Sequence, residues 1–124
     1  MLRFAQFGAG RIGTIHAANL ASTGATQLRY IVDVNSAAAA VLAAKHGAHV
    51  ADVATALGDP QIDAVIIASS TDTHAELIIA AARAHGAELL SDEARQPSLP
   101  NSRRSYKIPA VCDLPEVQVR CLSF

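Results

Sequence analysis

The chain has 124 residues, of which 51% are hydrophobic and 4% aromatic, and its formal net charge at pH 7 is −1. This length allows one domain at most, with a packed core of small aliphatic side chains. The near-neutral charge, with no basic cluster in the first ninety residues, argues against a nucleic-acid partner. No apolar run approaches the length of a membrane span, and Met1 leads directly into the first predicted strand. We therefore expect a cytoplasmic protein with no membrane partner and no signal peptide.

A glycine-rich segment separates the first predicted strand, residues 2–7, from the first predicted helix, residues 15–21. The six residues that open this turn are Gly8, Ala9, Gly10, Arg11, Ile12 and Gly13. By itself G-x-G-x-x-G fits a plain turn equally well. Between a strand and a helix, however, it is typical of a dinucleotide-binding fingerprint.

Each glycine of this turn has its own physical reason. Gly8 allows the tight turn out of the strand, Gly10 leaves room for a pyrophosphate, and Gly13 lets the helix pack close to the sheet. The free N–H groups of the first helical turn, together with the helix dipole, then favour the phosphate charge.

The second predicted strand, residues 27–33, ends in a carboxylate. Asp33 is the twentieth residue after Gly13, which is the spacing expected for the acid that binds a ribose. A carboxylate there accepts hydrogen bonds from both ribose hydroxyls and repels a 2′-phosphate, and the next two residues, Val34 and Asn35, offer no arginine. These residues predict NAD rather than NADP as the cofactor. The alternative is that Asp33 merely ends a strand and begins a turn.

Helices and strands alternate further along the chain. Ser36 is the expected N-cap of an alanine-rich helix that stops at Gly47. The elements after it are a strand at 48–50, a short helix at 52–57, a buried strand at 62–68 and a helix at 73–84. With right-handed crossovers this pattern predicts an α/β, Rossmann-like doubly wound parallel sheet of order 3-2-1-4. The sheet is incomplete, with about four strands, and an irregular C-terminal tail follows it.

The strand order reverses between the first and fourth strands, so the carboxyl ends of these two strands form a crevice. Residues 8–13 lie at one lip of this crevice and residues 69–74 at the other. Two separate sequence features thus converge on one place.

The composition changes after residue 88. We predict a dinucleotide-binding domain at 1–88 and a divergent tail at 89–124. The tail carries a basic patch that either binds an anion or is part of a poorly ordered linker. No metal site is predicted, because His46-x-x-His49 has no third ligand nearby and the two cysteines lack ligand spacing. The residues of the basic patch are Arg103, Arg104 and Lys107.

Two motifs together resemble the Gfo/Idh/MocA oxidoreductases, and most closely their inositol 2-dehydrogenase branch. The first is the glycine turn followed by His16-Ala17, and the second is Ala68-Ser69-Ser70-Thr71-Asp72-Thr73-His74-Ala75-Glu76. The resemblance covers about residues 2–86. It implies reversible hydride transfer between NAD and a secondary alcohol on a ring, with residues 69–74 along the nicotinamide side of the cofactor.

The predicted cofactor-binding residues combine the turn, the acid and this second motif. His74 could instead cap a helix together with Thr71 and Thr73, and His16 is expected to be a packed helix residue. The residues of the predicted site are Gly8, Gly10, Arg11, Ile12, Gly13, Asp33, Ser69, Thr71 and His74.

The chain departs from the family pattern after the second motif. Members carry a Glu-Lys-Pro motif whose lysine assists proton transfer, and a second domain that supplies an Asp and a His around the substrate. This sequence has no Glu-Lys-Pro. The only later lysine, Lys107, precedes Ile108 and does not align with that motif. We therefore assign no catalytic residue, and a polyol or sugar substrate would require a substrate domain.

The codons of residues 93–97, read one base later, can spell Lys-Pro-Val-Ser. This match suggests a frameshifted or truncated gene product whose tail is out of frame. The resulting hypothesis is an NAD-dependent dehydrogenase of the inositol or sugar class, represented by its cofactor-binding half. The alternative is a stand-alone NAD-binding or redox-sensing module without catalysis. A third alternative is a chain too incomplete to fold well. An apolar edge on the fourth strand would then favour aggregation or a homo-oligomer.

Overall fold

The computed structural model describes residues 1–85, 89–90, 98, 101–102, 114–115, 118 and 121–122. The chain divides into two compact units, Met1–Ser69 and Ser70–Phe124, and each contains a sheet of its own.

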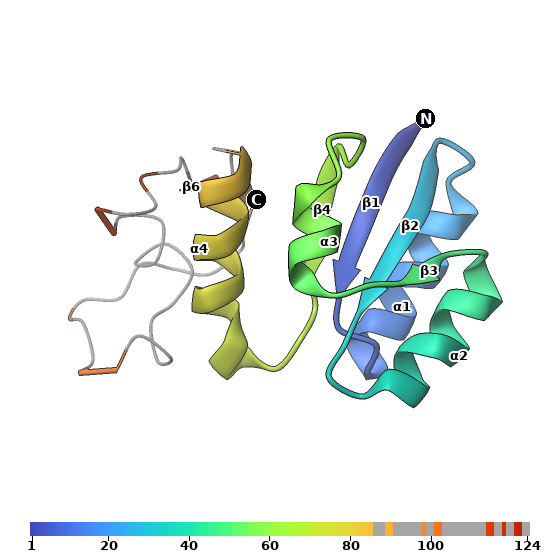
Figure 1. The fold of residues 1–124 in the computed structure, drawn as a ribbon, viewed down its shortest axis with the longest axis horizontal. Helices are drawn as coiled ribbons and strands as arrows, with labels where there is room; N and C mark the ends of the chain where they lie inside the picture. Colours follow the sequence, from blue (N-terminus) through green and yellow to red (C-terminus); the bar gives the residue numbers. More distant parts are fainter. Residues whose placement is uncertain are drawn as a thin grey trace. The chain divides into compact units, whose positions relative to one another are not determined.

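The first unit is built on a parallel four-stranded sheet of order β3-β2-β1-β4 (Figure 1). β1 is paired on both sides, and Ala5, Gln6 and Phe7 at its carboxyl end are buried. The predicted Rossmann-like class and strand order are confirmed. The strands are β1 (Leu2–Phe7), β2 (Thr26–Val32), β3 (His49–Val50) and β4 (Ala64–Ile67).

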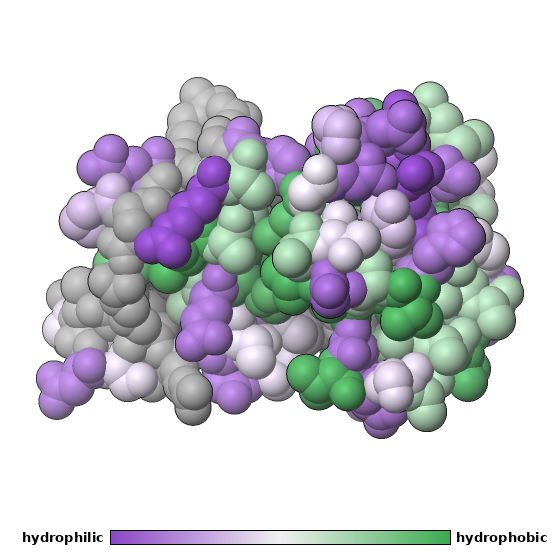
Figure 2. Space-filling model, in the orientation of Figure 1, coloured by the Kyte–Doolittle hydropathy of each residue, from purple (hydrophilic) through white to green (hydrophobic). Residues whose placement is uncertain are grey.

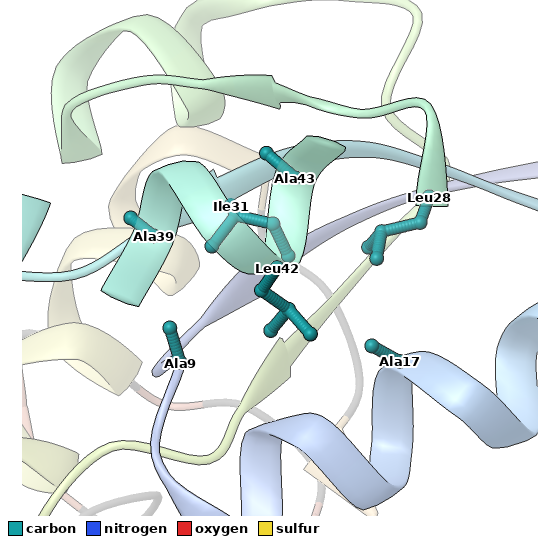
Figure 3. Packing of buried hydrophobic residues seen from close by; sticks show 7 residues of the cluster. All are labelled: Ala9, Ala17, Leu28, Ile31, Ala39, Leu42 and Ala43. Atoms are coloured by element: carbon teal, nitrogen blue, oxygen red, sulfur yellow. The ribbon is translucent and has the colours of Figure 1, made fainter. Parts of the chain in front are cut away.

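The helices of this unit form a core of small side chains with β2. α1 and α2 contact β2 and each other, whereas α3 contacts β1 and β2. Figure 3 shows alanines of α1 and α2 beside Leu28 and Ile31 of β2, with Leu42 of α2 between them. Alanine side chains are small, so the helices can approach the sheet closely. The core is therefore filled without aromatic side chains, which are scarce in this chain. The helices are α1 (Arg11–Ser22), α2 (Ser36–His46) and α3 (Val53–Gly58).

The ends of α2 correct one prediction and confirm another. Asn35, not Ser36, is the N-cap: its side chain accepts a hydrogen bond from the N–H of Ala38 at 3.0 Å, and Ser36 is already helical. Asn35 has the extended backbone that a cap requires, and its carbonyl accepts the first helical hydrogen bond. Gly47 ends the helix with φ +66°, as expected of a glycine stop.

The connection between α3 and β4 is tied to β2 by a carboxylate. Asp59 Oδ2 accepts hydrogen bonds from Arg29 Nε at 2.8 Å and from the Tyr30 hydroxyl at 3.0 Å. The backbone N–H of Gln61, the Tyr30 hydroxyl and the Arg29 charge together lower the pKa of Asp59. The strand predicted over 62–68 begins later than expected because Ile62 still donates its N–H to Asp59 O in a turn.

The second unit begins with a 3₁₀ turn that leads into a helix. The helix predicted over residues 73–84 is confirmed, and Ala75 and Ile78 are its buried residues. Two short pieces of the chain beyond it pair as parallel strands. The elements are η1 (Thr71–Thr73), α4 (His74–His85), β5 (Leu89–Leu90) and β6 (Cys121–Leu122).

Most of the remaining tail lies outside the described residues, including the predicted basic patch. The domain boundary at residue 88 stays a prediction. Within the described part of the chain, no helix is both long and apolar enough to cross a bilayer. Figure 2 shows hydrophobic groups interspersed with polar ones on one face of the surface.

Candidate functional site

The glycine turn lies where the carboxyl ends of three strands meet. The N–H of Gly8 donates to Val32 O at the end of β2 (2.8 Å), and the N–H of Ala68, just after β4, donates to Phe7 O (2.7 Å). Gly8 has φ +113°, a backbone conformation that favours glycine. A Cβ on Gly8 would also clash with the Ala68 carbonyl and lie 2.7 Å from Ser69 N. Gly8 is thus required both by its backbone angle and by the close approach of the β4 end.

The other two glycines differ in what surrounds them. A Cβ on Gly13 would clash with the Gly8 carbonyl, so α1 packs against the turn at a distance that only glycine permits. A Cβ on Gly10 would meet no atom within 4 Å. Gly13 therefore has a packing role, whereas nothing in the described protein itself requires a glycine at Gly10.

The N-terminus of α1 is open in a way that suits an anion. Its N-cap, Gly10, contributes no side-chain hydrogen bond, and its first turn holds no acidic residue. In contrast, α2 and α3 are capped by the side chains of Asn35 and Asp52. The N–H of Thr14 makes the bond to Gly10 O, so the N–H groups ahead of it precede the helical ladder and can face a ligand. Arg11 and Ile12, in this first turn, are exposed.

Asp33 is joined directly to the glycine turn. Its Oδ2 accepts a hydrogen bond from Ala9 N at 2.7 Å, and its Oδ1 accepts one from Asn35 N, also at 2.7 Å. A carboxylate that only began a turn would need the bond to Asn35 but not the bond to Ala9. The structure thus places the predicted acid beside the predicted turn, with Val34 exposed next to it.

The second predicted motif is divided between the two units. Ser69 follows β4 in the first unit and lies next to Gly8, whereas Thr71 and His74 belong to the second unit. There, the Thr73 hydroxyl donates to Ser70 O at 2.7 Å, and the N–H of His74 donates to Thr71 O. These local bonds form the start of α4, and a contact of Thr71 or His74 with a cofactor stays a prediction.

The structure also gives the position of His16 and of the side chains that could bind a metal ion. His16 is half-buried on α1. In the described part of the chain, no group of three or more His, Cys, Asp or Glu side chains is arranged to hold a metal ion.

Sequence reasoning missed Gln6. Its side chain is fully buried in β1, and its Nε2 donates to Gly8 O at 2.9 Å and to Gly13 O at 2.8 Å. The available signal was a polar residue inside an apolar strand, two positions before the glycine turn.

A parallel α/β sheet with a glycine turn and an acid at its carboxyl edge defines the class of dinucleotide-binding Rossmann domains. Residues 2–92 match the model of an oxidoreductase family with an NAD-binding Rossmann fold. The chain belongs to this family, the Gfo/Idh/MocA oxidoreductases, and carries its NAD-binding portion.

Several proteins similar to this chain are named as inositol dehydrogenases. The inositol 2-dehydrogenase of Rhizobium meliloti is 40% identical over 83 residues, and the myo-inositol 2-dehydrogenase of Thermotoga maritima is 42% identical over 85 residues. Each match covers 67% of this chain and 25% of the relative. A solved structure from Sinorhizobium meliloti, assigned as a myo-inositol dehydrogenase, is 31% identical with a TM-score of 0.74. That match covers 100% of this chain and 36% of the other. The chain thus spans about a quarter of the length of its curated relatives.

Proposed function

We propose that NAD lies along the carboxyl edge of the sheet, with its pyrophosphate at Gly10 and the N-terminus of α1 and its adenosine ribose at Asp33. The observation that carries this proposal is the 2.7 Å hydrogen bond between Ala9 N and Asp33 Oδ2, which joins the turn to an acid 24 residues away. The open space at Gly10 is where a phosphate can approach the backbone.

The remaining site residues extend this arrangement. Arg11 and Ile12 lie in the exposed first turn of α1 and flank the pyrophosphate position. Ser69, Thr71 and His74 are proposed to line the nicotinamide side. The place of Ser69 beside Gly8 supports this assignment for the first of the three.

The hydrogen bonds of Asp33 support the proposal that the site prefers NAD to NADP. A carboxylate offers about four lone-pair sites, and the N–H groups of Ala9 and Asn35 take two of them. Two sites remain for the two hydroxyls of an adenosine ribose. A 2′-phosphate would replace one of these donors with a negative charge, which a fixed carboxylate repels.

We further propose that the activity to which this cofactor site belongs is dehydrogenation of a ring polyol or sugar, as the names of the relatives suggest. NAD, when bound, supplies the hydride acceptor; the residues of this chain bind and orient it. The second candidate is a binding module without catalysis, favoured because the sequence contains no Glu-Lys-Pro. NADH binding without NAD reduction by myo-inositol would identify the second candidate, and reduction would identify the first. A cytoplasmic location and self-association are also proposals.

Substitution of Asp33 tests the cofactor site. We expect Asp33→Ala to weaken NADH binding at least about tenfold, because each lost hydrogen bond to a charged group contributes about 1.5–3 kcal/mol. NADPH binding should weaken less or improve, so the preference for NADH relaxes. Fluorescence titration with both cofactors measures this.

Asp63→Ala is the matched control. Asp63 Oδ2 accepts the N–H of Arg3 at 2.8 Å, so it makes the same kind of bond at the opposite edge of the sheet, where β4 begins. Its exchange should leave both affinities unchanged. An unchanged cofactor preference in Asp33→Ala would show that the acid does not bind the ribose.

A further inference from the structure

Gln6 is the buried polar side chain nearest in sequence to the glycine turn. It lies opposite Ile31 of β2 and Ile66 of β4, in the most enclosed part of the sheet, and none of its surface is exposed. A polar side chain in such a position is unfavourable unless it makes hydrogen bonds. The partners of Gln6 therefore show what its amide is for.

Both hydrogen-bond partners of Gln6 belong to the glycine turn. Nε2 donates to the carbonyls of Gly8 and Gly13, the first and last glycines of the motif. Carbonyls only accept, so the amide nitrogen must face both of them and the orientation of the amide is fixed. Oε1 is then left, among the described residues, without a partner. An apolar side chain would fill the same space without burying an unpaired oxygen, so packing alone does not account for glutamine here.

The Gly8 carbonyl and the Ala9 N–H belong to one planar peptide group. In a trans peptide they point in opposite directions, and here the carbonyl accepts from Gln6 while the N–H donates to Asp33. Gln6 and Asp33 thus hold the same peptide plane from its two sides. Hydrogen bonds arranged in such a series polarise and strengthen one another.

We propose that Gln6 is a positioning residue of the NAD site, which orients the Gly8–Ala9 peptide and, through it, the Asp33 carboxylate. This inference rests on the proposed role of Asp33 at the ribose. Gln6 does not touch the cofactor. Its amide holds the turn through the Gly8 and Gly13 carbonyls. Asp33 and the open N-terminus of α1 therefore keep one relative placement before NAD binds, as preorganised sites require.

A double-mutant cycle on NADH affinity tests the coupling between Gln6 and Asp33. In the full 124-residue chain, we expect Gln6→Leu and the volume-conserving Gln6→Met each to raise the NADH Kd by about tenfold. In the Asp33→Ala background the same exchanges should change Kd by less than about threefold, because the acid they position is gone. The preference for NADH over NADPH should fall in both Gln6 variants, which a purely structural role would not produce.

Gln27→Leu is the control, because Gln27 lies exposed on β2 of the same sheet. Its exchange should leave the NADH Kd and the cofactor preference unchanged. Thermal melting of every variant identifies those that are folded at the assay temperature, and Gln6→Met keeps the test available if Gln6→Leu unfolds. If neither Gln6 variant folds, protection of the Ala9 amide from hydrogen exchange in Asp33→Ala decides. A fully protected Ala9 amide in that variant would overturn the inference.

Two failures can be told apart. If Asp33→Ala itself leaves NADH binding unchanged, the proposed ribose site is wrong. If Asp33→Ala weakens binding but a folded Gln6 variant binds like the wild type, or loses the same factor in both backgrounds, the positioning role of Gln6 is refuted.

Discussion

Replacement of Gly10 by valine separates folding from cofactor binding. Gly10 has φ −79° and ψ −161°, an extended conformation with a negative φ that does not require glycine. A Cβ there meets no atom within 4 Å. Valine is a poorer N-cap than glycine by up to about 1 kcal/mol, but it also restricts the unfolded chain, which offsets about 0.4–1 kcal/mol. The free energy of unfolding should therefore change by less than about 1 kcal/mol, or a few degrees in Tm.

The effect on NADH binding should be much larger. The isopropyl group would occupy the space in front of the N-terminus of α1, where the pyrophosphate is proposed to contact backbone N–H groups. Hydrogen bonds to a charged phosphate contribute about 1.5–3 kcal/mol each, and loss of two would cost about 3–6 kcal/mol. Since about 1.4 kcal/mol is a factor of ten, Kd should rise at least a hundredfold, roughly. Gly10→Ala should have a smaller effect, because one methyl group reaches less far.

NADH fluorescence titration and thermal melting, applied to the same preparations, test both halves of this prediction. Gly58→Ala is the control matched to Gly10→Ala, since a Cβ on Gly58 at the end of α3 also meets nothing within 4 Å. It should bind NADH like the wild type and melt at the same or a slightly higher temperature, because alanine restricts the unfolded chain. If Gly10→Val melts normally and binds NADH with unchanged Kd, the pyrophosphate does not lie at Gly10. If Gly10→Val unfolds instead, the fold itself requires a glycine at this position.

Two further substitutions test stability. Gly8→Ala should lower the free energy of unfolding by about 2 kcal/mol or more, since it combines a positive φ with a clash at the Ala68 carbonyl; a urea midpoint equal to that of the wild type would contradict this. Asp59→Asn should destabilise the protein at neutral pH, because the backbone N–H of Gln61 and the nearby side chains lower the pKa of Asp59 below its unfolded value of about 3.9. That stabilisation is present above the unfolded pKa and is lost as pH falls through the folded pKa, so the gap in unfolding free energy between wild type and variant should shrink in acid. If urea titrations give the same difference in unfolding free energy at neutral pH and in acid, the role of the ionised carboxylate is refuted.

The sheet order and the reasons for two of the glycines could be predicted from the sequence. Alternation of apolar runs with alanine-rich segments, combined with right-handed crossovers, leaves few arrangements other than β3-β2-β1-β4. The packing demands on Gly8 and Gly13 follow from the same geometry, because a strand, a tight turn and a helix on the sheet bring backbone close to backbone at both positions.

The helix cap and the hydrogen-bond partners of Gln6 could not be predicted from the sequence, for a physical reason. Asn35 and Ser36 are both good N-caps, and only the backbone path out of β2 decides which one is extended and which is helical. The partners of Gln6 are backbone carbonyls, whose directions are set by the folded turn and leave no mark on the side-chain pattern.

The spacing between the glycine turn and Asp33 has its cause in the register of β1 and β2. Phe4 lies opposite Leu28, but Ala5 lies opposite Tyr30, so Arg29 is an additional residue in β2. Without it, a continuous register would bring Phe7 opposite Ile31; with it, Phe7 lies opposite Val32. The additional residue therefore sets Asp33 back by one position along β1, level with Gly8 rather than with Ala9. Since side chains alternate between the faces of a strand, that single step decides which way the acid points and whether its carboxylate can accept the N–H of Ala9. Asp33 is thus placed by the pairing of the two strands as much as by the count of residues between the glycine turn and the acid.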